Sequence, residues 1–286
     1  LSCSILVETI KNNELLDLKS KHANLTKRVV ALFTEYNSSS IHDIGSYMVS
    51  AMLRIFKMAN TFVGLVEESG DFQAIYSQVR MLADNIFSFI TVYNCPMPER
   101  EFRHYLYILD GELQCYDLFE IMQPKRESFQ SESNYLKAIE HCKRGKQKRG
   151  QVIAECITKL ENNELTLQYP NETKELIESR NWKFNNIFSR ESVSWNKLYR
   201  KYAPKETAAY LSYLSQLVHG LGMSNYCLWS KEEDYITAIT TVQKLLHFIE
   251  LFIQNRLEYM FTPSVSEAYE KIAEKEIENA MEKTRL

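Results

Sequence analysis

The sequence has few residues that break helices. It contains 8 glycines and 6 prolines among 286 residues. Few breakers mean few tight turns, which favours long helices over a many-stranded sheet. With 45% apolar and 25% charged residues, the composition is that of an ordinary globular protein with a large core. We therefore expect an all-α bundle of roughly eight to eleven helices.

The sequence also lacks a strong net charge and a long apolar run. The formal net charge is -3, so no global basic field attracts nucleic acid, although a local patch still can. No uninterrupted apolar run approaches the ~20 residues that a membrane-spanning helix needs. We expect a cytoplasmic protein that does not bind membranes. The chain begins at Leu1 rather than Met, which is consistent with the removal of an N-terminal signal before this residue.

The six cysteines lack the spacing of a disulfide or zinc framework. No Cys-x-x-Cys pair occurs, and most cysteines lie in apolar helical patterns, which favours buried free thiols in a reducing compartment. Glu101 and His104 match half of a carboxylate-bridged di-iron motif, but no second Glu-x-x-His pair completes it. GxGxxG, P-loop and HExxH patterns are absent too, so we expect neither a metal nor a cofactor.

Apolar residues recur every three or four positions along several segments, which is the period of an amphipathic helix. The clearest run spans residues 41–66 and follows a capping-box-like start at Ser40. Asp71 is placed to cap the next helix, and Pro96 to end it.

We expect one helical domain over residues 1–286. Gly145 and Gly150 interrupt a long helical pattern, which predicts a kink or loop. Residues 161–171 have an extended or looped pattern and form the best, though weak, candidate for a boundary. Residues 262–286 predict a peripheral Glu/Lys-rich helix whose narrow apolar stripe packs by one edge or against a partner.

His219 is the most notable candidate for chemistry. Ser212, Ser215 and His219 are spaced three and four apart, so they share one helix face. A histidine near a helix C-terminus is stabilised as a cation and favours an anionic ligand. The alternative is a histidine that caps the last carbonyls and packs in the core. Ser215 and His219 also have the spacing of a nucleophile and a base, but no orienting acid or nucleophile elbow accompanies them.

Arg80 and Asp84 form an i,i+4 pair inside the apolar pattern of the helix that follows Asp71. If they face inward, the buried charge needs partners, and a polar pocket results. The alternative is an ordinary surface pair, and the sequence leaves both open.

One dense basic run consists of Lys143, Arg144, Lys146, Lys148 and Arg149. Phosphate binding is its functional interpretation. Interleaved aromatic residues are absent, which counts against recognition of single strands. The alternative is a solvated helix face.

The pair Arg80 and Asp84 is followed, over a hundred residues later, by Tyr-x-x-x-Leu-Ser-x-x-x-His-Gly at 210–220. This arrangement resembles a family of bacterial all-helical domains of unknown function, which is distantly similar to the HEPN superfamily of nucleotide- and RNA-associated bundles. The resemblance covers residues 40–260 and implies a polar cleft lined by Arg80, Asp84, Ser215 and His219. Active HEPN ribonucleases carry Arg, four to six residues and then His on one helix. No histidine here has an arginine at that upstream distance.

The resemblance implies a non-enzymatic binding module associated with nucleotides or RNA. Arg80 would clamp an anion and Asp84 would orient Arg80. Ser215 and His219 would donate hydrogen bonds, and Tyr210 would also belong to the site. Two alternatives stay open. One is a hydrolase or nuclease that uses His219 as general acid and base, and the other is a scaffold that forms a homodimer through its last helix.

Overall fold

The computed structural model describes residues 3–68, 71–189, 191–218 and 232–283. These residues form eleven α-helices and no β-strand, so the all-α prediction is confirmed. The chain separates into two compact units. Unit 1 comprises residues 1–90 and 195–286, and unit 2 comprises residues 91–194. Neither boundary falls within the segment 161–171 that the sequence favoured.

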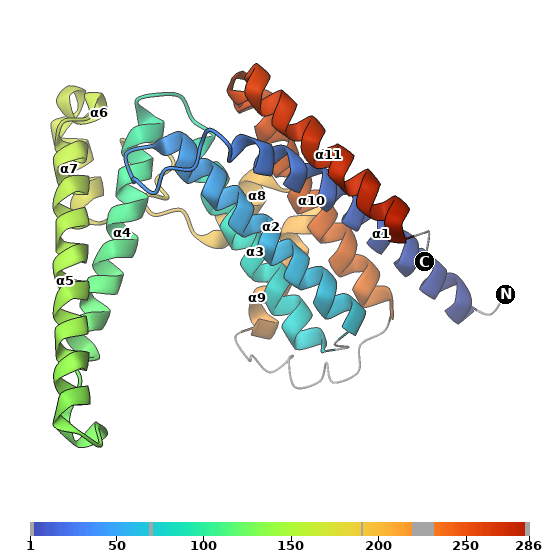
Figure 1. Cartoon of the computed structure of the whole chain (residues 1–286). Helices are drawn as coiled ribbons and strands as arrows, with labels where there is room; N and C mark the ends of the chain where they lie inside the picture. Colours follow the sequence, from blue (N-terminus) through green and yellow to red (C-terminus); the bar gives the residue numbers. More distant parts are fainter. Residues whose placement is uncertain (1–2, 69–70, 190, 219–231, 284–286) are drawn as a thin grey trace. The chain divides into compact units, whose positions relative to one another are not determined.

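Unit 1 is built around α1, against which three long helices pack. Its elements are α1 (Cys3–Leu32), α2 (Ile44–Glu68), α3 (Phe72–Tyr93, whose last three residues count with unit 2), α8 (Trp195–Tyr202), α9 (Lys205–Val218), α10 (Glu232–Arg256), the 3-10 turn η3 (Glu258–Met260) and α11 (Pro263–Lys283). α1 packs against α2, α10 and α11, and α8 packs against α9 (Figure 1). Fully buried Leu25, Phe62, Phe87 and Leu246 belong to the resulting core.

The caps at the starts of α2 and α3 follow from aspartate side chains. Asp43 caps α2, because its Oδ1 accepts the Ser46 backbone N–H at 2.9 Å. The sequence placed this start at Ser40, three residues too early. Asp71 caps α3 as predicted and accepts the N–H groups of Gln73 and Ala74 at 2.9 and 3.1 Å.

Two helices of unit 1 are long and apolar enough to cross a membrane, judged by length and composition alone. Their most apolar stretches lie in Ile44–Glu68 and Glu233–Arg256, with mean hydropathy 1.3 and 1.4. The search for uninterrupted apolar runs did not find these two helices. Scattered polar residues interrupt such a run, but they lower the mean hydropathy of a long window only slightly. The fold buries 44% and 50% of these stretches, and core helices of globular proteins share these properties.

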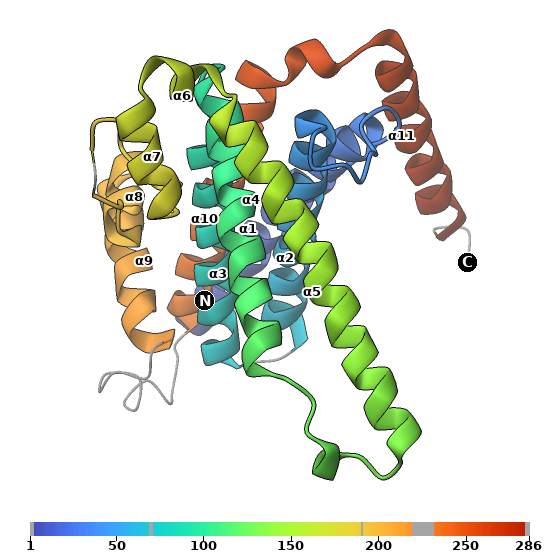
Figure 2. The same ribbon diagram turned by 90° about the vertical axis from the view of Figure 1, so that its left-hand side faces the viewer.

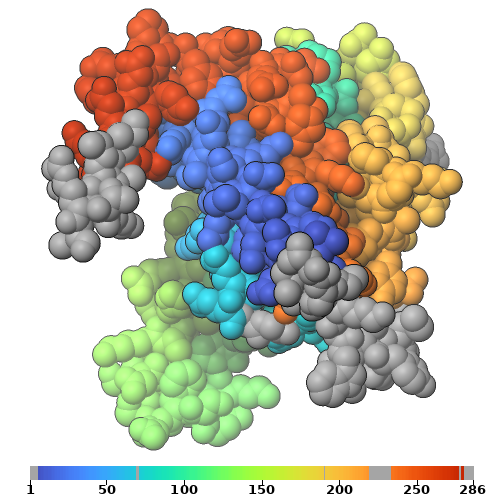
Figure 3. All heavy atoms as spheres, turned by 90° about the vertical axis from the view of Figure 1, so that its right-hand side faces the viewer, coloured from blue at the N-terminus to red at the C-terminus, as the bar shows by residue number. Residues whose placement is uncertain are grey.

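The last helix, α11, lies along α1 on the surface of unit 1 (Figure 3). Val265 is fully buried, and Lys27 on α1 forms an ion pair with Glu276 at 2.5 Å. α11 therefore packs by one edge against the chain's own first helix. Formation of a homodimer through this helix stays a prediction.

Unit 2 is organised around a helical hairpin. Its elements are α4 (Glu99–Ile121), the 3-10 turn η1 (Arg126–Ser128), α5 (Glu132–Glu161), α6 (Glu164–Gln168) and α7 (Pro170–Glu178). α4 and α5 run side by side and are joined at one end through η1 (Figure 2). The sequence predicted an extended or looped segment at 161–171, but most of these residues are helical. Asn163 caps α6, because its side chain accepts the Leu165 N–H at 3.0 Å.

The kink or loop predicted at Gly145 and Gly150 is also wrong, because α5 is continuous through both residues. Gly145 serves the packing of the hairpin instead. A Cβ atom at this position would lie 2.7 Å from the ring of Phe119 on α4, closer than real Cβ contacts. The missing side chain therefore lets the aromatic ring of α4 rest on the backbone of α5.

Four cysteines, at positions 95, 115, 142 and 156, are free thiols, but they are not uniformly buried. Cys156 is buried in the α4–α5 hairpin, whereas Cys95 and Cys142 are half-buried. Cys115 is exposed on α4, which contradicts the expectation of burial at this position.

Candidate functional site

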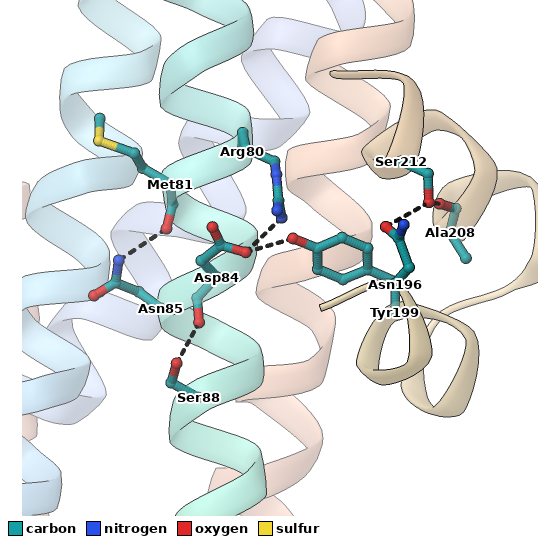
Figure 4. A network of polar contacts seen from close by, with 9 residues as sticks. All are labelled: Arg80, Met81, Asp84, Asn85, Ser88, Asn196, Tyr199, Ala208 and Ser212. Atoms are coloured by element: carbon teal, nitrogen blue, oxygen red, sulfur yellow. Dashed lines mark hydrogen bonds and ion pairs between the residues drawn. The ribbon is translucent and has the colours of Figure 1, made fainter. Parts of the chain in front are cut away.

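Arg80 and Asp84 face the interior of unit 1, where they meet Tyr199 of α8 (Figure 4). Arg80 is only 8% exposed, and its Nη1 donates to Asp84 Oδ1 at 2.5 Å. The Tyr199 hydroxyl donates to the same carboxylate oxygen. The guanidinium carbon lies 4.6 Å from the centre of the Tyr199 ring, a distance typical of a cation–π contact. The pair is therefore an inward-facing structural link between α3 and α8.

This link leaves Arg80 poorly suited to clamp a ligand. Burial lowers the pKa of Arg80, and the negative charge of Asp84 opposes that shift. An incoming anion would have to compete with Asp84 for the guanidinium. Neither of the two surface hollows described below is lined by Arg80 or Asp84.

The remaining residues of the sequence-predicted cleft lie on or after α9. Ser215 is half-buried, and Tyr210 is half-buried with a hydroxyl that has no hydrogen-bond partner among the described residues. Burial raises the pKa of Tyr210, with smaller contributions from Tyr76 and Asp234. His219 lies outside the described residues, so the structure gives no distance between it and Arg80.

An open hollow of about 600 Å³ lies over α8 and α9 in unit 1, and we call it the α8–α9 hollow. Its lining includes Arg200, Lys205, Ala209, Ser212, Tyr213 and Gln216. Its volume falls within the ~300–1,000 Å³ range of small-molecule sites. Arg200 and Lys205 are exposed, and neither forms an ion pair with a carboxylate of the described chain. The hollow therefore has two cations available to an anion.

The packing of α8 on α9 determines which side chains meet in this hollow. The Ser212 hydroxyl lies 2.9 Å from the Ala208 carbonyl of its own helix and 3.1 Å from Oδ1 of Asn196 on α8 (Figure 4). Leu198 and Tyr199 turn into the core, which leaves Arg200 on the outer side of α8. The sequence analysis did not identify this group of side chains in the α8–α9 hollow. The amphipathic pattern of residues 195–202 could have indicated a short helix with Arg200 on its outer face.

The predicted basic run lies on α5 and is largely neutralised. Lys146 pairs with Glu120, and Nη1 of Arg149 lies 2.6 and 2.9 Å from the two oxygens of Glu112. These hydrogen bonds raise the pKa values of Lys146 and Arg149. Much of the run's charge therefore serves contacts between α4 and α5.

The other cations of the run lie further from α4. Arg144 lies 3.6 Å from Glu140 on the same helix. Lys143 and Lys148 are exposed and have no ion pair within the described chain. The two lysines are the part of the run still available to a phosphate.

Arg103 is a buried cation of unit 2 that sequence reasoning did not single out. Its side chain bonds Glu99 at 2.7 Å and the carbonyls of Trp182 and Phe184 at 3.0 and 2.9 Å. The guanidinium also lies 3.6 Å from the centre of the Phe184 ring. These contacts hold the segment after α7 against α4. The only local signal is the i,i+4 spacing of Glu99 and Arg103 beside an apolar stripe.

The half-motif Glu101 and His104 also serves packing. Nδ1 of the buried His104 lies 3.0 Å from the Tyr93 hydroxyl, whereas Glu101 accepts from Asn163 at 3.1 Å. Across the described parts of the chain, no three His, Cys, Asp or Glu side chains group in a way that would hold a metal ion.

A second hollow, of about 390 Å³, lies along α7 in unit 2. Its charged lining residues, Glu172 and Glu175, are acidic. An anion would be repelled there, so the α8–α9 hollow is the better candidate for an anionic ligand.

No protein-family model, curated protein or solved structure matches this chain. The candidate site therefore rests on the residues and their geometry, and the HEPN-like resemblance stays a hypothesis carried by short motifs.

Proposed function

We propose that this protein is a non-enzymatic binding module for a phosphate-bearing ligand of the nucleotide or nucleic-acid class. The ligand's phosphate occupies the α8–α9 hollow. The observation that carries the proposal is that Arg200 and Lys205 line one hollow without a carboxylate partner in the described chain. Ser212 and Gln216 add neutral hydrogen-bonding groups to the same lining.

A comparison of the cationic groups supports this choice of site. Arg80 is neutralised by Asp84, and Arg149 by Glu112, so a phosphate at either would first have to break an ion pair. A phosphate at Arg200 and Lys205 gains charge-assisted hydrogen bonds without that cost.

Arg80 and Asp84 take a supporting role in this proposal. Tyr199 precedes Arg200 on α8, and the buried network fixes Tyr199 to α3. The network thereby holds the backbone that presents Arg200. Arg80 and Asp84 are thus positioning residues, and Arg200 and Lys205 are the binding residues.

Calorimetric titration with pyrophosphate tests the site. Arg200→Ala/Lys205→Ala is expected to weaken binding at least ~30-fold, since a hydrogen bond to a charged group contributes ~1.5–3 kcal/mol. The matched control is Lys143→Ala/Lys148→Ala, which removes two exposed, unpaired lysines from α5. Equal affinity of the wild type and the Arg200/Lys205 variant would place the phosphate elsewhere and overturn the proposal.

The absence of catalysis is tested separately from binding. We expect no release of phosphate from adenosine triphosphate and no cleavage of a short RNA into fragments when either is incubated with the protein. Steady turnover that disappears in His219→Ala would favour the hydrolase alternative over a binding module.

A further inference from the structure

The lining of the α8–α9 hollow changes in chemical character along α9. Lys205 stands at the start of the helix, Ala209 in the middle, and Tyr213 and Gln216 near its end. Spacings of four, eight and eleven residues place these side chains on one helix face. At ~1.5 Å per residue, the stripe from Lys205 to Gln216 is ~16 Å long.

Both cations of the hollow belong to the same end of this stripe. Asn196 of α8 lies beside Ser212 of α9, and the two helices are joined by the short segment between Tyr202 and Lys205. α8 therefore runs antiparallel to α9. Arg200, one turn after Asn196, lies toward Lys205 and away from Gln216.

The opposite end of the stripe carries an aromatic ring and an amide. Tyr213 is 37% exposed and lines the hollow. The Gln216 side chain is exposed beside it. A ring offers a stacking surface to any nucleobase, and an amide both donates to and accepts from the edge of a base.

The middle of the stripe is formed by small side chains. Ala208 and Ala209 both line the hollow, and Ser212 adds a hydroxyl. A ligand that spans the cations and the aromatic ring would cross this floor. Small residues leave room for a ring-sized, hydroxyl-bearing group such as a sugar.

We infer that the α8–α9 hollow binds a free nucleoside phosphate, an inference that rests on the proposed function. The phosphate contacts Arg200 and Lys205, the ribose lies over Ala209, and the base stacks on Tyr213 with its edge at Gln216. The order of chemical groups along the lining matches the order of phosphate, sugar and base. A single-stranded nucleic acid would instead need a succession of aromatic residues along a basic track. The lining of the hollow contains one aromatic residue, Tyr213.

Titration calorimetry with adenosine monophosphate, ribose 5-phosphate and pyrophosphate tests the inference on the full chain. The wild type is expected to bind adenosine monophosphate at least ~5-fold more tightly than ribose 5-phosphate, since it gains the stacking of one base on Tyr213. Tyr213→Ala removes this difference, whereas Tyr213→Phe keeps it.

Ala209→Leu provides a second variant that leaves the cations and the aromatic ring unchanged. Ala209 is exposed, and leucine is a good helix former, so the helix tolerates the change. The larger side chain fills the floor of the hollow. We expect at least ~5-fold weaker binding of adenosine monophosphate with unchanged binding of pyrophosphate, since the leucine displaces the ribose and thereby the base from its stacking position on Tyr213.

The outcomes separate this inference from the proposed function. Equal affinities for adenosine monophosphate and ribose 5-phosphate, both abolished by Arg200→Ala/Lys205→Ala, would overturn the nucleotide and leave the phosphate site intact. A failure of all three probes to bind would overturn both the nucleotide inference and the proposed phosphate site. A ten-nucleotide single strand that binds more than 100-fold more tightly than adenosine monophosphate, with a steep salt dependence, would replace the nucleotide by nucleic acid.

Discussion

Tyr199 of α8 donates a hydrogen bond to Oδ1 of Asp84 on α3, the same oxygen that binds Arg80. One carboxylate oxygen thus receives a phenol and a guanidinium from two different helices. The contact joins segments that are 115 residues apart in the chain. Its stability depends on all three groups being present, because each is at least partly removed from water.

Removal of the carboxylate should therefore destabilise unit 1. Asp84→Ala leaves the Arg80 guanidinium and the Tyr199 hydroxyl without their shared acceptor, and we expect a loss of ~2–3 kcal/mol in the free energy of unfolding. Urea denaturation followed by circular dichroism measures it. Arg80→Met/Asp84→Leu should lose less than Asp84→Ala, because it buries no unpaired charge. Strictly additive effects in a double-mutant cycle would contradict the coupling.

The sequence predicted most of the helices because apolar periodicity is a local property. Asp71 and Pro96 bound α3 as expected, since caps and prolines act on adjacent residues. The role of Gly145 was not predictable, because it depends on Phe119, which lies 26 residues away on another helix. A glycine inside a helix indicates a kink only when no neighbouring side chain uses the space it leaves.

The candidate site was less predictable than the fold. Burial of Arg80 was one of two alternatives, and its partner Tyr199 was not expected, since no pattern links residues so far apart. Arg200 and Lys205 were missed because four residues separate them in the sequence and no known motif links them. Only the turn from α8 into α9 brings them to one hollow.

Arg103 should be indispensable to the segment that follows α7. Arg103→Lys keeps the charge but loses the planar fork that reaches two carbonyls, so we expect a loss of ~1–2 kcal/mol in stability. The Val193 amide, which donates to the Lys183 carbonyl at 3.1 Å, should exchange its hydrogen faster in this variant. Arg144→Lys, at a mostly exposed arginine, is the matched control. Unchanged exchange at Val193 would show that Arg103 does not hold this segment.

Two glycines of α5 should respond oppositely to alanine. Gly150→Ala is expected to stabilise the protein by up to ~1 kcal/mol, since the nearest atom, on Tyr116, lies 3.9 Å from the new Cβ. Gly145→Ala forces the Phe119 ring to move and should be less stable than Gly150→Ala by ~1–2 kcal/mol. Thermal unfolding measures both. The difference should shrink in a Phe119→Leu background, and equal stabilisation by the two substitutions would refute the close packing.

The cysteines of unit 2 should differ sharply in reactivity. Burial raises the pKa of the Cys156 thiol to about 12, whereas Cys115 is exposed. At pH 8 the thiolate fraction of Cys156 is on the order of 10³-fold below that of an ordinary thiol. Iodoacetamide should label Cys115 and spare Cys156 in the folded protein, as read by peptide mass spectrometry. Labelling in urea is the control, where both should react, and equal native rates would contradict the burial of Cys156.

Glu250 of α10 should make stability depend on acid pH. Its Oε2 accepts from His247 at 2.8 Å and pairs with Lys21 at 3.0 Å, and these contacts lower the pKa of Glu250, the hydrogen bond from His247 most.

Because the pKa of Glu250 in the folded protein lies below the ordinary value of 4.5, the stabilisation is complete above pH 4.5. It is lost as the pH falls through the folded pKa. Glu250→Gln should therefore lower the free energy of unfolding at pH 7 by ~0.5 kcal/mol, a small effect because the pair is partly exposed, and the variant should converge with the wild type in strong acid. Glu161→Gln, at an exposed glutamate, controls for the loss of one carboxylate. A Glu250→Gln deficit that persists unchanged from pH 7 to pH 2 would show that packing, rather than charge, stabilises this contact.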